Sequence, residues 1–190
     1  MQNAFQRRLA LAFTLAFLGS ASLVGASISA DNPMVGGAPM YDTKNIIENA
    51  VNSADHTTLV AAVKAAGLVE ALQGEGPFTV FAPTNAAFDK LPAGTVDTLL
   101  KPENKDMLTK VLTAHVVAGR VTAADLMAKI ESMGGSYNMT TLSGDTLTAA
   151  IRNGSVYIFD ESGGAAKVTV ADVMQSNGVI HVVDDVLLPK

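Results

Sequence analysis

The 190-residue chain contains no cysteine and no tryptophan, and only 5% of its residues are aromatic. The lack of cysteine excludes disulfides, thiol catalysis, cysteine-ligated metals and a lipid-modified cysteine anchor. Charged residues make up only 16% of the chain and include no basic run, so nucleic acid and anionic membrane surfaces are not expected partners. A folded domain must therefore be stabilised by its hydrophobic core, for which 48% of hydrophobic residues is ample.

The first 30 residues predict a secretory signal peptide. Arg7 and Arg8 precede an uncharged apolar stretch, residues 9–26, in which small residues become frequent towards the end. This order is typical of a cleaved export signal, with cleavage after Ala26 or after Ala30. The alternative is a retained membrane anchor, because the apolar stretch is just long enough to span a bilayer.

Removal of this segment leaves 11 basic and 18 acidic residues, a net charge of −7. No later segment is apolar for long enough to cross a bilayer. We therefore expect an exported, soluble protein of the periplasm or the extracellular space. Residues 31–41 are rich in proline and glycine and predict an extended N-terminal arm, and residues 42–190 predict one compact domain.

Helical patterns crowd the first half of that domain and strand patterns the second. Helices are expected within residues 42–54, 58–67, 68–72, 85–91, 102–114 and 122–130. Strands are expected at residues 78–81, 136–142, 146–152, 155–160, 167–170 and 179–188, and Asn153-Gly154 is the strongest hairpin signal. This segregation predicts an α+β fold rather than a parallel βαβ sheet.

Two details of the helices can be predicted further. Asp42 and Thr122 precede the first and last helices and are expected N-caps. Pro102 suits the first turn of the clearest helix. The buried stripe of that helix is expected to comprise Met107, Leu108, Val111 and Leu112.

The three histidines are the main candidates for chemistry. His56 lies at a polar helix start and is expected to be a solvated surface residue. His115 and His181 each precede two valines and are expected to be buried residues with hydrogen-bonded rings. A two-histidine metal site would need further ligands, and no His-x-x-x-His motif occurs. We expect neither a metal nor a cofactor.

The adjacent carboxylates Asp184 and Asp185 resemble an acid/base pair. Neighbours on a strand point to opposite faces, however, so they would not share one substrate. The sequence has no G-x-S-x-G elbow, P-loop or dinucleotide fingerprint, and residues 160–166 lack the ligand spacing of a calcium loop. The sequence therefore predicts no catalytic residue and a protein that is not an enzyme.

Three stretches resemble motifs of the fasciclin domain. "TVFAPTNAAFDKLP" (79–92) and "NGVIHVVDDVLLP" (177–189) are similar to its two hallmark motifs, and "AHVVAG" (114–119) is similar to its Tyr-His motif. The resemblance covers residues 42–190. Ala114 and Ala118 stand where the family usually has tyrosine and proline, so tyrosine-dependent adhesion is not carried over to this chain.

The resemblance implies a wedge of two β-sheets with helices packed along one side. It also implies a structural role for ten motif residues. These are Phe81, Pro83, Thr84, Asn85 and Phe88 at a sharp strand-to-helix turn, His115 in the Tyr-His motif, and Asn177, Gly178, His181 and Asp184 around the terminal strand 179–188.

The same resemblance implies a non-catalytic cell-adhesion or extracellular interaction module, like the small secreted single-domain members found in bacteria. Its partner would be a cell-surface or matrix protein or a polysaccharide, contacted through the arm 31–41 and exposed loops. The alternative is a soluble carrier of an apolar small molecule such as a carotenoid, because some secreted fasciclin proteins bind carotenoids. The oligomeric state does not follow from the sequence.

Overall fold

The computed structural model describes residues 32–190, so the predicted signal peptide lies outside the described residues. The helices are α1 (Ile46–Ala50), α2 (Thr57–Ala66), α3 (Val69–Gln73), α4 (Asn85–Asp89), α5 (Thr95–Leu99), α6 (Lys105–Ala114) and α7 (Ala123–Ser132), with 3-10 turns at Ala54–His56 and Pro102–Asn104. The strands are β1 (Met34–Val35), β2 (Ala38–Pro39), β3 (Phe78–Pro83), β4 (Val116–Ala118), β5 (Ser136–Thr140), β6 (Thr146–Arg152), β7 (Ser155–Phe159), β8 (Ala165–Gln175) and β9 (Gly178–Val183).

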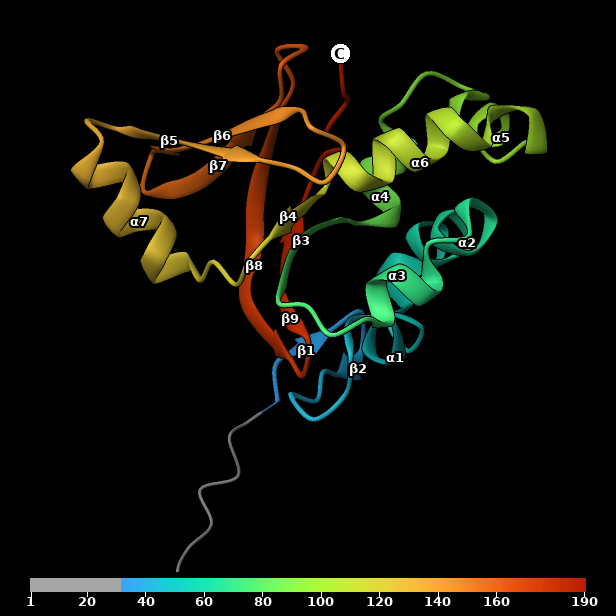
Figure 1. Ribbon diagram of the computed structural model, residues 1–190, viewed down its shortest axis with the longest axis horizontal. Helices are drawn as coiled ribbons and strands as arrows, with labels where there is room; N and C mark the ends of the chain where they lie inside the picture. Colours follow the sequence, from blue (N-terminus) through green and yellow to red (C-terminus); the bar gives the residue numbers. More distant parts are fainter. Residues whose placement is uncertain (1–31) are drawn as a thin grey trace, which may run out of the picture. The chain divides into compact units, whose positions relative to one another are not determined.

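Within residues 32–190, seven strands are joined in the order β4-β3-β9-β8-β7-β6-β5, and β1 and β2 form a separate pair (Figure 1). The long strand β8 belongs to both halves of the larger sheet, because its first residues pair with β7 and its later ones with β9. The register of β8 on β9 shifts twice between Val168 and Val173, and Asp172 has a φ of 58°. Such bulges bend a strand, so the two halves meet as a wedge along β8. The predicted α+β class is confirmed.

The two motifs that resemble the fasciclin hallmarks lie side by side at the centre of the sheet. Strands β3 and β9 are parallel, and Phe81 is paired with His181. All six residues of β9 are buried. A parallel pair needs a long crossover connection, and the chain from α4 to β8 supplies it.

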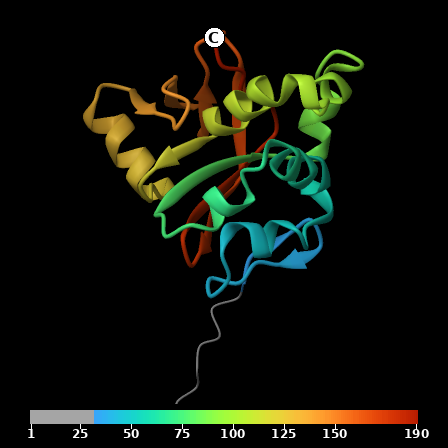
Figure 2. The same ribbon diagram turned by 45° about the vertical axis from the view of Figure 1, so that its right-hand side comes forward.

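The central strands are covered on both faces (Figure 2). Val80 and Ile180 pack into a cluster with helices α1, α2 and α6, whereas Phe81 and Val183 face a second cluster with α7 and strands β5 to β8. Alternate residues of a strand point to opposite faces, so a continuous apolar run such as 179–183 can fill both clusters.

Capping residues set where the helices begin. Asn45 and Glu48 form a capping box at α1, and Thr122 and Asp125 form another at α7. Thr122 is therefore the N-cap that the sequence predicts, but Asp42 is not a cap. Asn45 replaces it because its side chain lies at the correct spacing to accept from the Glu48 N–H.

The Asn153-Gly154 hairpin forms between β6 and β7, with φ values of 51° and 73° at the two turn residues. Positive φ at both positions is the geometry of the type I′ turn, which matches the twist of the two strands. Gly67 ends α2 with a φ of 74°, as the sequence predicts.

Two other predictions differ from the structure. Met107 is 59% exposed, because it lies outside the buried face of α6, which contains Leu108, Val111, Leu112 and Ala114. Strand β9 ends at Val183 rather than continuing to Leu188. Beyond β9, the Leu187 N–H donates to the His115 ring and the Leu188 N–H donates to the Asp160 carboxylate, so neither bonds to a neighbouring strand.

The predicted extended arm is a small hairpin that belongs to the domain. β1 and β2 pair through Met34–Pro39 and Val35–Ala38. Val35 and Met40 are buried in the first hydrophobic cluster. Among the described helices, none combines the length and the apolar character needed to cross a bilayer.

Candidate functional site

His181 lies on β9, fully buried, with its ring stacked on Phe81 of β3. The Asp172 N–H donates to Nδ1 at 3.3 Å, so Nδ1 carries the lone pair and Nε2–H donates to the Val121 carbonyl at 2.8 Å. Burial lowers the pKa of His181, only partly offset by the Val121 carbonyl, so the ring is neutral. Both nitrogens are used, and neither is free for a substrate or a metal.

His115 is also buried, but at the end of α6 rather than on a strand. The Leu187 N–H donates to its Nε2 at 2.9 Å, and its Nδ1–H donates to the Val111 carbonyl at 2.8 Å. Burial lowers the pKa of His115 to about 4. The ring thus joins the end of a helix to the C-terminal segment.

Asn177 and Gly178 join β9 to the helical layer and to β3. The Asn177 side chain accepts from the Ile46 N–H at 3.1 Å and donates to the Leu72 and Gly74 carbonyls at 2.8 and 3.0 Å. A Cβ on Gly178 would lie 2.2 Å from the Phe78 carbonyl oxygen. The contact between the parallel strands therefore requires glycine here.

The strand-to-helix turn after β3 uses the next motif residues. Pro83 ends β3, and the Thr84 hydroxyl accepts from the Ala87 N–H as the N-cap of α4. Asn85 accepts from the Thr58 N–H at 3.0 Å and donates to the Ala54 carbonyl at 2.8 Å. The buried ring of Phe88 anchors α4 in the first cluster.

The carboxylates Asp184 and Asp185 lie beyond the end of β9, where the chain bends. Asp184 accepts from the Lys167 N–H at 2.8 Å, and Asp185 from the Val186 N–H at 2.9 Å. Both approach the exposed Lys90 ammonium, at 4.0 and 3.5 Å. One oxygen of each carboxylate faces the Lys90 ammonium, and the other accepts a hydrogen bond from a backbone N–H group.

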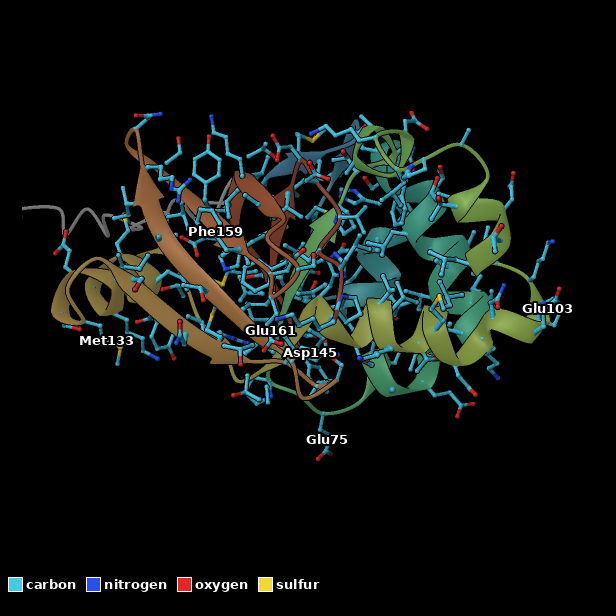
Figure 3. The ribbon with its side chains drawn as sticks, turned by 90° about the horizontal axis from the view of Figure 1, so that it is seen from above. Glu75, Glu103, Met133, Asp145, Phe159 and Glu161 are labelled. Atoms are coloured by element: carbon cyan, nitrogen blue, oxygen red, sulfur yellow. The ribbon has the colours of Figure 1, made fainter. Side chains whose placement is uncertain are left out.

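A second acidic pair, Asp145 and Glu161, lies at the β5–β6 and β7–β8 connections (Figure 3). Glu161 accepts from the Thr146 N–H at 2.9 Å, and Asp145 accepts from the Ser143 hydroxyl at 2.6 Å. Within residues 32–190, no three His, Asp or Glu side chains are grouped closely enough to hold a metal ion.

The polar side chains of the family motifs bond chiefly to backbone groups of other segments, as the hydrogen bonds of His181, His115, Asn177 and Asn85 show.

His56 is the histidine whose environment the sequence interpretation predicted wrongly. It is 3% exposed rather than solvated. It occupies one helical stripe with Leu59, Val60 and Val63, at spacings of three, four and seven residues, and this pattern was the available signal of its burial. Its sequence neighbours Asp55, Thr57 and Thr58 are polar, and they led to the prediction of a solvated residue.

The surroundings of His56 leave one ring nitrogen without a partner. Nδ1 is 2.8 Å from the Ser53 hydroxyl oxygen. Nε2 is buried and makes no hydrogen bond, the one such side-chain atom among the described residues. Burial lowers the pKa of His56. The Ala82 carbonyl, which lies near the ring without forming a hydrogen bond of normal geometry, and the Asp55 charge offset part of that lowering.

His56 also lines a cavity between the first helices and the central strands. The cavity leaves about 50 Å³ of free volume. Its walls are almost wholly apolar and come from α1, α2, β3 and β9, with contributions from β1, α3, α6 and β8. It is a second candidate site, distinct from the hydrogen-bonded motif residues.

The fasciclin domain model matches residues 54–189. The chain belongs to the fasciclin domain family. The resemblance carried by the three motifs is thereby confirmed. The match includes α2 to β9, whereas β1, β2 and α1 precede it. Residues of β1 and α1 also line the cavity.

This fasciclin domain is similar to bacterial and animal proteins. It is 54% identical over 144 residues to protein sll1483 of Synechocystis sp.. The matched region covers 76% of this chain and 73% of that protein. It is 36% identical over 145 residues to immunogenic protein MPB70 of Mycobacterium bovis, covering 74% of this chain and 66% of the other. It is 38% identical over 131 residues to the transforming growth factor-beta-induced protein ig-h3 of Sus scrofa, covering 69% of this chain but 17% of the other.

The fold is similar to a solved FAS1 domain pair from the insect cell adhesion molecule fasciclin I, with a TM-score of 0.67 at 20% identity. The likeness covers 76% of this chain and 51% of the other. At this identity it shows a shared fold. Fasciclin domains are typically extracellular and take part in adhesion or other interactions.

Proposed function

We propose that this protein is exported and acts in the periplasm or outside the cell as a non-catalytic interaction module that binds a surface or matrix protein or a polysaccharide. The observation that carries the proposal is the use of the motif side chains. His115, Asn177 and His181 each hold backbone groups of distant segments, which favours a rigid scaffold over a reaction centre. Binding then falls to exposed residues.

The best candidate contact surface comprises Met34, Tyr41 and Val51, which we term the N-terminal patch. These exposed apolar side chains come from β1, the segment after β2 and the end of α1, which lie next to one another (Figure 1). Tyr41 is held against α1 by reciprocal bonds between its backbone and the Asn49 side chain. Exposed apolar side chains mark a contact region where they form a continuous patch, and the proposal is that these three do so.

A binding assay with the exported protein tests this proposal. Labelled protein is added to host envelopes and extracellular material, and retention is compared with that of a variant carrying serine at Met34, Tyr41 and Val51. The matched control carries serine at three other exposed apolar positions, Met127, Met133 and Ile151. Retention lost in the first variant only supports the patch, and equal retention in all three proteins contradicts it. Cell fractionation and the intact mass test export and the expected cleavage after Ala26 or Ala30.

A second candidate function, carriage of an apolar small molecule, is favoured by the apolar cavity beside His56. Native mass spectrometry and absorption spectroscopy of protein from its host test it, because a carried molecule adds mass and a carotenoid adds visible colour. A molecule as long as a carotenoid would extend well beyond 50 Å³ of free volume. A measured mass equal to that of the polypeptide alone, with no visible absorbance, would leave the interaction module as the function.

A further inference from the structure

We infer that the cavity between the first helices and the central strands binds a small apolar molecule with one hydroxyl group, and that this hydroxyl bonds to His56 Nε2. The inference rests on the carrier function proposed above and names its ligand class and its anchoring residue. The ligand is a short aliphatic alcohol.

The first support is the unpartnered ring nitrogen. His56 is 3% exposed and lines the cavity, and its Nε2 makes no hydrogen bond within residues 32–190. A buried polar atom without a partner is unfavourable, so a ligand that supplies the partner gains free energy beyond its apolar contacts. The other lining histidine, His115, has both nitrogens bonded and cannot serve this purpose.

The position of the His56 ring is set by its neighbours. Its Nδ1 contacts the Ser53 hydroxyl, which is itself buried at the start of the 3-10 turn. Ser53 is closely surrounded, because a Cβ on Gly36 would lie 2.3 Å from its Oγ, and the Gly36 carbonyl accepts from the Ala54 N–H at 3.1 Å. The hairpin β1–β2 thus holds the turn that presents His56 to the cavity.

The polar group of the ligand follows from the Ser53–His56 contact. If Ser53 donates to Nδ1, Nε2 carries the proton and needs an acceptor; if Nδ1 donates to Ser53, Nε2 needs a donor. A hydroxyl group is both a donor and an acceptor, so it satisfies either tautomer. A carbonyl or an ammonium group would satisfy only one.

The body of the ligand follows from the remaining walls. Apolar side chains such as Ile47, Leu59 and Val80 surround the space and offer no polar partner. A water molecule needs about 10–15 Å³ of such space, so 50 Å³ holds roughly three or four groups of that size. This volume suits a three- or four-carbon chain better than a ring system.

Entry is possible from the side of the helices. Most lining residues are buried, but Ala50, Val60 and Val69 are partly exposed and Lys64 is exposed. These residues belong to α1, α2 and α3. The lining therefore comes nearest to the surface at these residues, which is where a ligand would enter.

Nitrogen-detected NMR of the histidine rings provides the test. The ¹⁵N-histidine-labelled protein contains only three histidines, and His181, which is hydrogen-bonded and does not line the cavity, is the internal reference. The protein is titrated with 1-butanol and, separately, with 1-chlorobutane, which has the same body without the hydroxyl. We expect a saturable shift of His56 Nε2 with 1-butanol, a smaller shift with 1-chlorobutane, and an unchanged His181.

Two variants locate the binding. His56→Phe keeps an aromatic ring and removes the nitrogen. It should weaken 1-butanol binding, followed by the ring shift of the lining residue His115, about three- to tenfold, the effect of one lost hydrogen bond. Ala50→Leu fills the mouth and should abolish the His56 shift. The comparison of the two ligands on the unaltered protein needs neither variant to fold.

Equal His56 shifts with both ligands, or no saturable shift, would overturn the inference. A saturable shift in a protein that carries no cargo from its host would reject the carrier function and keep the site. Cargo in the host protein together with an unresponsive His56 would keep the carrier function and reject this site.

Discussion

The rings of Phe81 and His181 stack across the parallel strands β3 and β9, with centroids 5.7 Å apart and planes inclined by 26°. The same imidazole bonds to the Val121 carbonyl and the Asp172 N–H. One ring thus joins β3, β9, the bulge of β8 and the loop before α7. The histidine in the second hallmark motif therefore has a structural role, because it connects four segments of the wedge.

His181→Ala should lower the free energy of unfolding by about 1–3 kcal/mol, because it leaves the Val121 carbonyl and the Asp172 N–H buried without their partner. Urea unfolding followed by circular dichroism measures the change. Glu103→Ala, at an exposed position, serves as the control and should stay within about 0.5 kcal/mol of the unaltered protein. Equal stability of the His181 and Glu103 variants would contradict a structural role for the ring.

Stability should fall as the pH falls from 7 to 5. The pKa of His115 is about 4 in the folded protein and 6.5 ordinarily, so in this range the unfolded chain binds the proton and the folded chain does not. The loss from His115 alone is about 2 kcal/mol. The pKa values of His56 and His181 are also lowered by burial and act in the same direction.

Unfolding curves at several pH values between 5 and 7 measure this slope, in a range where the carboxylates stay ionised. His115→Gln removes the titrating group and should flatten the slope, although the variant is less stable at pH 7. An unchanged slope in that variant would show that other groups cause the dependence.

Gly178→Ala should be strongly destabilising, by about 3 kcal/mol, because its Cβ would lie 2.2 Å from the Phe78 carbonyl oxygen within the β3–β9 pair. Gly74→Ala is the matched control, since Gly74 also has an ordinary φ and its Cβ would lie 3.2 Å from the Ala71 carbonyl oxygen. Thermal unfolding of both variants tests the prediction. Similar melting temperatures would indicate that the strands can separate at little cost.

Asn177→Ala should loosen the helical layer more than the sheet. It removes hydrogen bonds to Ile46 in α1 and to the carbonyls of Leu72 and Gly74 at the end of α3. Hydrogen exchange should become faster in residues 44–50 and 69–76, with little change in β6 and β7. Uniformly faster exchange would mean that the variant instead destabilises the whole domain.

Much of this architecture can be predicted from local sequence. The Thr122 cap, the Gly67 helix end and the Asn153-Gly154 turn depend on residues within a few positions of one another. The apolar run around His181 likewise indicates a strand buried on both faces. These features depend on local backbone preferences and side-chain periodicity, both of which can be read from neighbouring residues in the sequence.

The rest depends on segments distant in sequence. His56 is buried because β1, α1 and β3 close around a turn that looks polar locally, and the arm 31–41 becomes a hairpin because Val35 and Met40 find that same core. The wedge arises where β8 changes partners. The sequence alone determined which residues are apolar, turn-forming or able to cap. Only the tertiary structure decided which polar atoms found a partner, because hydrogen bonds and cavities depend on where separate segments meet.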